Sequence, residues 1–266
     1  MGNKSKKFST KCVHEGEIKD TMYQGIVSPL FMSTTYPWFG GDDPEKKPYP
    51  RYFNTPNQEF LSKKIASLEN GEKALIFTSG MAAISTSIMA NVKTGDHIVV
   101  QNDIYGGTRN FVQTEFDKFG IEYSFTDGLD PSSFSDQIKD NTVGIYLETP
   151  SNPLLKIVDL KSVSSIAKDN GVWTMIDNTF SSPVNQNPID HGIDIVLHSA
   201  TKYLGGHSDI SAGAVISTES RIEQILNSAK NFGGNLSDYT VWLPVSYTHL
   251  RAHETRHDLV CRLLLE

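Results

Sequence analysis

The chain has 266 residues, of which 38% are hydrophobic and 21% charged, and its formal net charge is −7 at pH 7. This composition is typical of a folded globular protein and excludes a disordered one. The negative charge argues against a general nucleic-acid or anionic-membrane binder. No apolar run approaches the ~20 residues that a membrane helix needs.

The N-terminus has lysines but no apolar stretch after them, which is not the pattern of a secretory signal. The two cysteines, Cys12 and Cys261, form neither a disulfide framework nor a zinc-ligand spacing. Both features favour a cytoplasmic location, where thiols stay reduced.

Prolines and glycines interrupt residues 1–45, which we expect to form an extended N-terminal arm. After the arm, short apolar runs alternate with segments of helical periodicity. This pattern predicts helices at 57–69, 79–92, 110–120 and 158–171, and strands at 74–78, 97–101, 121–125, 143–150, 172–178, 193–199 and 213–217. The alternation predicts an α/β fold with a mostly parallel sheet covered on both faces. In such a sheet ligands gather beyond the carboxyl ends of the strands.

The end of the chain is unlike the rest. Residues 245–266, VSYTHLRAHETRHDLVCRLLLE, back-translate to a sequence that resembles a transposase-type sequencing adapter and the primer that follows it. We expect the native chain to break near Leu243 or Pro244, although a genuine C-terminal helix is the alternative. The expected organisation is therefore an arm at 1–45, one large domain at 46–243 and an adapter-derived tail at 244–266.

Two residues at strand ends carry the main chemical signal. Lys202 leaves the apolar run 195–197 in the segment IVLHSATKYLGG. On the rim of an apolar pocket its neutral amine could form a Schiff base with an aldehyde, although an ordinary surface lysine also fits this position. Asp177 ends the buried run 172–176, where its charge needs a partner such as a protonated pyridine nitrogen. Its alternative role is to cap the following turn.

The segment TSGMAA (78–83) predicts a phosphate site, because a strand enters a helix through Ser-Gly and leaves backbone N–H groups free at the helix N-terminus. Many α/β turns look the same, so this signal alone is weak. Ser199 and Thr201, which flank the lysine turn, could donate hydroxyl groups to the same phosphate.

Further candidates lie in three segments. Tyr105 in DIYGGTRN could lie flat on an aromatic ring and transfer a proton, or it could simply be a packing residue. Tyr49 and Arg51 in YPRYFNTPN offer a phenol and a guanidinium to a phosphate. Glu148 and Asn152 follow a strand in ETPSNP, and Asn152 could donate to a phenolic oxygen.

These segments, in the order YPRYFNTPN, TSGMAAI, YGGT, ETPSNP, IDNTF and HSATKYLGGHSD, closely resemble the Cys/Met-metabolism family of pyridoxal-phosphate (PLP) enzymes, from about residue 10 to 243. That family includes cystathionine γ-synthase, the cystathionine lyases, methionine γ-lyase and O-acetylhomoserine sulfhydrylase. The resemblance implies the PLP-binding large domain of the aspartate aminotransferase-like fold (fold type I), with the smaller C-terminal domain missing. It also implies a homotetramer of tight dimers with shared active sites.

The resemblance implies a role for each matching residue. Lys202 would hold PLP covalently and, once released, take the Cα proton of the substrate. Asp177 would pair with the pyridine nitrogen, and Tyr105 would stack on the ring and assist the leaving group. The other contacts would be Gly80, Met81, Ser199 and Thr201 with the phosphate, Asn152 with the ring oxygen, and Tyr49 and Arg51 with the phosphate of the neighbouring subunit.

The implied function is transsulfuration of a small amino-acid substrate, and C–S elimination of the cystathionine β-lyase type is the reaction that we expect. γ-Replacement of the cystathionine γ-synthase or O-acetylhomoserine sulfhydrylase type uses the same residues and stays open. An aminotransferase and a truncated chain that only binds PLP are further alternatives. A nucleotide-binding α/β protein lacks support, because no GxGxxG or P-loop motif occurs where a strand meets a helix.

Two departures from the family pattern stand out. Asn54-Thr55-Pro56-Asn57 replaces the usual Asn-Pro-Thr. The arginine that grips the substrate carboxylate would belong to the missing domain. Gly107 stands where methionine γ-lyases tend to have a cysteine, which favours the cystathionine enzymes.

Overall fold

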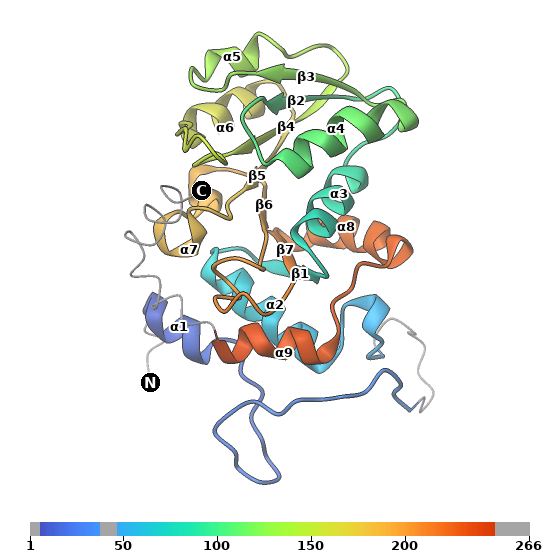
Figure 1. The fold of residues 1–266 in the computed structure, drawn as a ribbon, viewed down its shortest axis with the longest axis vertical. Helices are drawn as coiled ribbons and strands as arrows, with labels where there is room; N and C mark the ends of the chain where they lie inside the picture. Colours follow the sequence, from blue (N-terminus) through green and yellow to red (C-terminus); the bar gives the residue numbers. More distant parts are fainter. Residues whose placement is uncertain (1–5, 38–46, 248–266) are drawn as a thin grey trace.

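The computed structural model describes residues 6–37 and 47–247, which form a seven-stranded sheet with helices on both faces (Figure 1). The strands are β1 (Lys73–Phe77), β2 (His97–Gln101), β3 (Glu122–Thr126), β4 (Thr142–Glu148), β5 (Trp173–Asp177), β6 (Ile195–His198) and β7 (Gly213–Ser217). Their spatial order is β1-β7-β6-β5-β4-β2-β3. β7 runs antiparallel to β1 and β6, and all the other pairs are parallel. The prediction of a mostly parallel sheet is confirmed.

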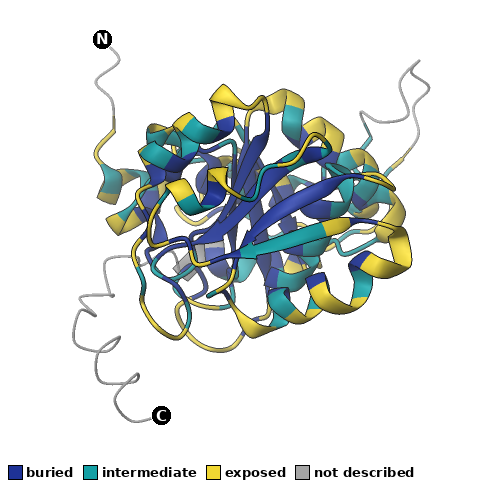
Figure 2. Cartoon of the chain, turned by 90° about the horizontal axis from the view of Figure 1, so that it is seen from above, coloured by how far each residue is buried: buried dark blue, intermediate teal, exposed yellow. Residues whose placement is uncertain are grey.

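Helices cover the sheet in two layers, each with its own apolar core. One layer comprises α3 (Gly80–Ala90), α4 (Gly106–Phe119) and α8 (Glu219–Phe232), and the other includes α2 (Pro56–Leu68) and α6 (Leu160–Asp169). The helices α1 (Phe8–His14) and α9 (Asp238–Tyr247) pack against α2. Figure 2 shows the central strands buried between helices whose outer faces are exposed. Single turns complete the fold, namely η2 (Pro50–Tyr52), α5 (Ser132–Ser135), α7 (Ser182–Asn185) and η3 (Pro188–His191).

The departure at 54–57 has a local structural role. Thr55 is the N-cap of α2 and forms a capping box with Gln58, while Pro56 takes the first helical position, where no N–H is needed. The Thr55 hydroxyl also donates to Asp238 at the start of α9, at 2.5 Å. The variant segment therefore starts one helix and fixes it to another.

The structure adds elements that the sequence analysis did not assign. Helix α1 lies within the expected extended arm, and α8 and α9 follow the last predicted strand. Helix α4 begins at Gly106, four residues before its predicted start. Helix α9 continues across the boundary expected at 243–244, and residues 248–266 of the expected tail lie outside the described residues. Within the described part of the chain, no helix is long and apolar enough to span a bilayer.

Candidate active site

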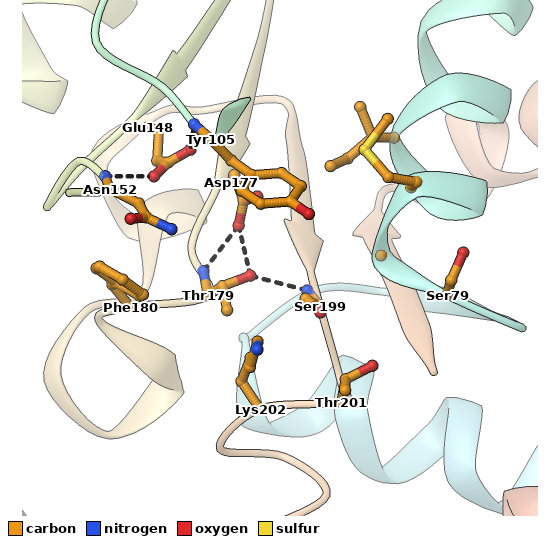
Figure 3. Close-up of a pocket in the computed structure, with 13 residues that line it drawn as sticks. Ser79, Tyr105, Glu148, Asn152, Asp177, Thr179, Phe180, Ser199, Thr201 and Lys202 are labelled. Atoms are coloured by element: carbon orange, nitrogen blue, oxygen red, sulfur yellow. Dashed lines mark hydrogen bonds between the residues drawn. The ribbon is translucent and has the colours of Figure 1, made fainter. Parts of the chain in front are cut away.

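A cavity of about 290 Å³ opens at the carboxyl ends of β4, β5 and β6, beside the N-terminus of α3. Figure 3 shows side chains from these elements and from the loop before α4 converging on it. Eight of the ten predicted site residues line this cavity: Gly80, Met81, Tyr105, Asn152, Asp177, Ser199, Thr201 and Lys202. The sheet edge therefore gathers these residues as the strand-end rule predicts.

Lys202 lies in the turn between β6 and β7. Its backbone N–H donates to the Ser199 carbonyl at 3.0 Å, and its own carbonyl accepts from Gly206 at 2.8 Å. The side chain is exposed on the rim of the cavity, so the described residues do not supply the desolvation that the sequence analysis expected. Within 6–37 and 47–247 its ammonium has no hydrogen bond or ion pair. Hydrogen bonds therefore hold the backbone of this turn at the rim, and none of those described holds the amine itself.

Asp177 ends β5 and is 5% exposed. Its Oδ1 accepts from the Thr179 backbone N–H at 3.0 Å and from the Thr179 hydroxyl at 2.5 Å. The Thr179 hydroxyl in turn accepts from the Ser199 N–H at 2.8 Å, which links the ends of β5 and β6. Burial raises the pKa of Asp177, and the two Thr179 donors and the nearby His198 oppose that rise.

The turn-capping role of Asp177 is present, because Oδ1 closes the following turn. Its pairing with a pyridine nitrogen stays a prediction. No basic side chain forms an ion pair with this carboxyl group in the part of the chain that the structure describes. A buried carboxyl group without a cation is an acceptor for a protonated heterocycle.

The N-terminus of α3 faces the cavity. The Ser79 hydroxyl caps the helix by accepting from the Ala82 N–H at 3.0 Å. The N–H groups of Gly80 and Met81 in the first turn have no preceding helical carbonyl to bond. A Cβ on Gly80 would lie 2.8 Å from Ser199 Cβ, so the backbone approaches Ser199 as only glycine allows. Together these N–H groups form an anion cradle beside the turn of Lys202.

Of the two hydroxyl groups expected to bind a phosphate, the one on Thr201 already forms hydrogen bonds within the protein. Thr201 Oγ1 donates to the Ala212 carbonyl at 3.1 Å and accepts from the Ala212 N–H at 3.0 Å. This hydroxyl therefore closes the turn that carries Lys202, in addition to lining the cavity. Ser199 Oγ has no such bond within the described segments, and it lies next to Gly80.

Tyr105 and Asn152 enter the cavity from opposite loops, and one carboxyl group holds both backbones. Glu148 accepts from the Tyr105 N–H at 2.8 Å and from the Asn152 N–H at 2.6 Å. Burial and the neighbouring Asp177 raise the pKa of Glu148 to about 8, against the lowering effect of the two N–H bonds. Tyr105 is the residue before α4, and 45% of its surface is exposed. In the view of Figure 3 its ring is drawn in front of Asp177, and both residues line the cavity.

Tyr49 and Arg51 do not line this cavity. The Arg51 guanidinium lies 5.5 Å from the ring centres of both Tyr49 and Tyr52, and Nη1 donates to the Lys230 carbonyl at 3.4 Å. These side chains form an exposed cluster of their own beside α8.

The sequence analysis missed some residues of the cavity. Thr179 and Phe180 line it and belong to the quoted segment IDNTF, yet neither received a role. Thr179 was detectable, because a hydroxyl residue two positions after a buried aspartate can close an Asx turn. Ile84 also lines the cavity, but its spacing in α3 resembles that of any core residue.

The comparisons with known proteins identify the family. The model of the family described as "Cys/Met metabolism PLP-dependent enzyme" matches residues 9–249. The chain belongs to this family. It is 38% identical over 237 residues to a probable cystathionine gamma-synthase of Herpetosiphon aurantiacus, which covers 89% of this chain and 74% of that protein. It is 46% identical over 190 residues to cystathionine beta-lyase MetC of Bacillus subtilis, which covers 71% of this chain and 48% of that protein.

Solved structures agree with this assignment. The crystal structure of metB from Corynebacterium glutamicum matches with a TM-score of 0.91 and 33% identity, over 99% of this chain and 70% of that one. A cystathionine gamma-lyase from Lactobacillus plantarum, solved with L-serine, matches with a TM-score of 0.89 and 34% identity, over 98% of this chain and 69% of that one. The chain thus spans about half to three quarters of the length of the relatives named here.

The cavity suits the cofactor of this PLP-dependent family. An amine stands at its rim, an anion cradle lies beside the amine, and the buried carboxyl group of Asp177 lacks a cationic partner among residues 6–37 and 47–247. The close approach of Gly80 to Ser199 leaves no room for a Cβ, which keeps the helix N-terminus within reach of a phosphate. The donor set therefore matches an aldehyde, a phosphate and a basic ring nitrogen.

Proposed function

We propose that the chain binds PLP in this cavity and performs transsulfuration chemistry on a sulfur amino acid, with C–S elimination of the cystathionine β-lyase type. The observation that carries the proposal is the buried Asp177, which faces the same cavity as Lys202 and the N-terminus of α3. The family membership supports it, as do relatives named cystathionine beta-lyase, gamma-synthase and gamma-lyase.

The proposal gives seven of the lining residues a part in binding PLP. Lys202 would bond the aldehyde carbon with release of water, Asp177 would hold the proton of the ring nitrogen, and Asn152 would donate to the phenolic oxygen. The α3 N-terminus at Gly80 and Met81 takes the phosphate, with Ser199 and Thr201 beside it. Tyr49 and Arg51 lie outside the cavity and reach the phosphate of a neighbouring subunit in a homodimer or homotetramer, which the exposure of their cluster supports.

Bound PLP supplies an electron sink next to the Cα of the amino acid. Once the amino group of the substrate has taken its place on the aldehyde carbon, the amine of Lys202 would take the Cα proton, because it is the basic group at the rim that has no other described partner. Tyr105, which lines the cavity and is 45% exposed, would cover the open face of the site and offer its hydroxyl to the departing sulfur. Phe180 adds an apolar side chain to the lining of the same cavity.

Absorption spectroscopy tests the binding proposal. The full chain is mixed with PLP, and its visible spectrum is compared with those of Lys202→Ala and of Lys161→Ala, a control at an exposed position of α6. We expect a visible band that shifts from that of free PLP in the wild type and the control, and that is absent in Lys202→Ala. A shifted band in Lys202→Ala would reject Lys202 as the residue that binds PLP.

Product analysis separates the reactions. With cystathionine and water, β-elimination releases pyruvate, ammonia and homocysteine, whereas γ-elimination releases 2-oxobutyrate, ammonia and cysteine. γ-Replacement instead consumes an O-acylhomoserine and a thiol, and it releases the carboxylic acid of the acyl group but no keto acid. This second candidate is retained because relatives named as gamma-synthases cover 89% and 90% of the chain. Net formation of thioether without keto acid would favour it over the lyase.

A further inference from the structure

Glu148 is the last residue of β4, and it is 4% exposed at the floor of the cavity. Its two carboxylate oxygens serve two different segments. Oε2 accepts from the Tyr105 N–H, in the loop between β2 and α4, and Oε1 accepts from the Asn152 N–H, in the loop after β4. At 2.8 and 2.6 Å these bonds have the short lengths of charge-assisted contacts.

The same two loops share one other side-chain link. The Ser151 hydroxyl donates to Asp103 Oδ2 at 2.6 Å. This link joins the residues beside Tyr105 and Asn152 but bonds neither of their N–H groups. Removing this link therefore tests the connection between the two loops without removing the bonds of Glu148 to Tyr105 and Asn152.

We propose that Glu148 is a positioning residue that holds the backbones of Tyr105 and Asn152 at a fixed separation. The Tyr105 ring and the Asn152 side-chain amide can then contact the same cofactor ring. The proposal rests on the proposed function, which assigns those two contacts. A carboxylate suits this task because it offers acceptor sites on two oxygens. Glutamine has one acceptor oxygen on its side chain, so Glu148→Gln keeps the shape but must give up one of the two N–H bonds.

The charge state of Glu148 gives the clamp a pH dependence. The groups that face it are Asp177, its direct partner in the β4–β5 register, Asp103 in the loop after β2, and Tyr146 on its own strand. Burial and Asp177 raise the pKa of Glu148 to about 8. Protonation below that pH converts one oxygen into a poorer acceptor, so the two N–H bonds are strongest above about pH 8.

Hydrogen exchange on the full chain without cofactor tests the clamp directly. In Glu148→Gln we expect the protection factor of the Tyr105 or the Asn152 amide to fall about 10-fold or more, the loss of one charge-assisted bond, while amides of β5 and β6 keep theirs. In the wild type both protection factors rise as pH passes through about 8, and in Glu148→Gln they do not. Ser151→Ala, the matched control, removes the Asp103 link and the acceptor of the Lys156 N–H, but it keeps the rise of both protection factors with pH.

A PLP titration of the same variants completes the test. We expect Glu148→Gln to weaken PLP affinity about 10-fold, and Ser151→Ala to leave it within a factor of about two of the wild type. Unchanged protection of both amides in Glu148→Gln, or a loss spread evenly over the sheet, would overturn the positioning role. If the wild type binds no PLP, the proposed function fails while the exchange data still decide whether the clamp exists.

Discussion

Thr179 links the ends of β5 and β6 through a single hydroxyl group, and its removal is the sharpest test of how the site is built. Thr179→Val keeps the size and the branching of the side chain but deletes the hydroxyl. The Asp177 carboxyl group loses the 2.5 Å donor, and the Ser199 N–H loses its 2.8 Å acceptor. The backbone donor to Asp177 from residue 179 remains.

The expected change in the free energy of unfolding follows from the loss of these two hydrogen bonds. A hydrogen bond to a charged group contributes about 1.5–3 kcal/mol, and a buried donor left without a partner costs about 1–3 kcal/mol. Ser199 is only half-buried at the cavity wall, so water replaces part of the second loss. We therefore expect Thr179→Val to lower the free energy of unfolding by about 3 kcal/mol at neutral pH.

The loss should also depend on pH. The pKa of Asp177 is already raised by burial, and Thr179 is one of the groups that oppose the rise. Thr179→Val therefore raises this pKa further. A protonated carboxyl group needs the lost donor less than a carboxylate does, so the destabilisation shrinks as pH falls toward about 4, the ordinary value for aspartate.

Urea unfolding followed by the fluorescence of the buried Trp173 on β5 measures the effect. Thr114→Val is the control, since it makes the same chemical change at an exposed position of α4 and should cost no more than about 0.5 kcal/mol. Equal losses in Thr179→Val and Thr114→Val would show that the hydroxyl bridge contributes nothing to the site, and would refute the reasoning.

Two further substitutions, one control and a second measurement on Glu148→Gln test other parts of the structure. Gly80→Ala places a Cβ 2.8 Å from Ser199, and we expect overpacking to destabilise the chain by about 1–3 kcal/mol in urea and to weaken PLP binding. Glu69→Ala removes the buried partner of His198 and should cost about 3–5 kcal/mol, whereas loss of the exposed Lys63–Glu59 pair through Lys63→Ala should cost under about 0.5 kcal/mol. Glu148→Gln should flatten the pH dependence of stability, because the raised pKa makes wild-type stability fall as pH rises from 4.5 to about 8; parallel profiles would contradict this.

Much of the sheet could be predicted, because its strands are short apolar runs bounded by turn residues. The predicted spans of β2 and β7 coincide with the observed ones. The direction of β7 could not be predicted, since GAVIS is buried on both faces and carries no alternation that separates parallel from antiparallel pairing. The early start of helix α4 could not be predicted, because Gly106 and Gly107, which have a low helix propensity, form its first positions.

In the site, too, some residues could be predicted from the local sequence, whereas others depend on tertiary contacts. Lys202 and Asp177 were predicted from their places at strand ends, which is a local signal. The double bond of Glu148 to Tyr105 and Asn152 depends on how two loops fold over one strand end, and no local pattern indicates it. Helix α8, by contrast, could have been predicted, because its apolar residues recur at helical spacing on one buried face.

The register of β4 and β5 places Glu148 directly beside Asp177, so two carboxyl groups share the floor of the cavity. Like charges at this spacing raise each other's pKa unless donors or cations compensate. Both oxygens of Glu148 are already occupied by N–H donors, whereas the described hydrogen bonds of Asp177 all go to Oδ1. A cation that enters the cavity therefore gains the most electrostatic stabilisation at Asp177 Oδ2. This is the physical reason why Asp177 is suited to bind a protonated ring, whereas Glu148 is suited to hold the two loops beside it.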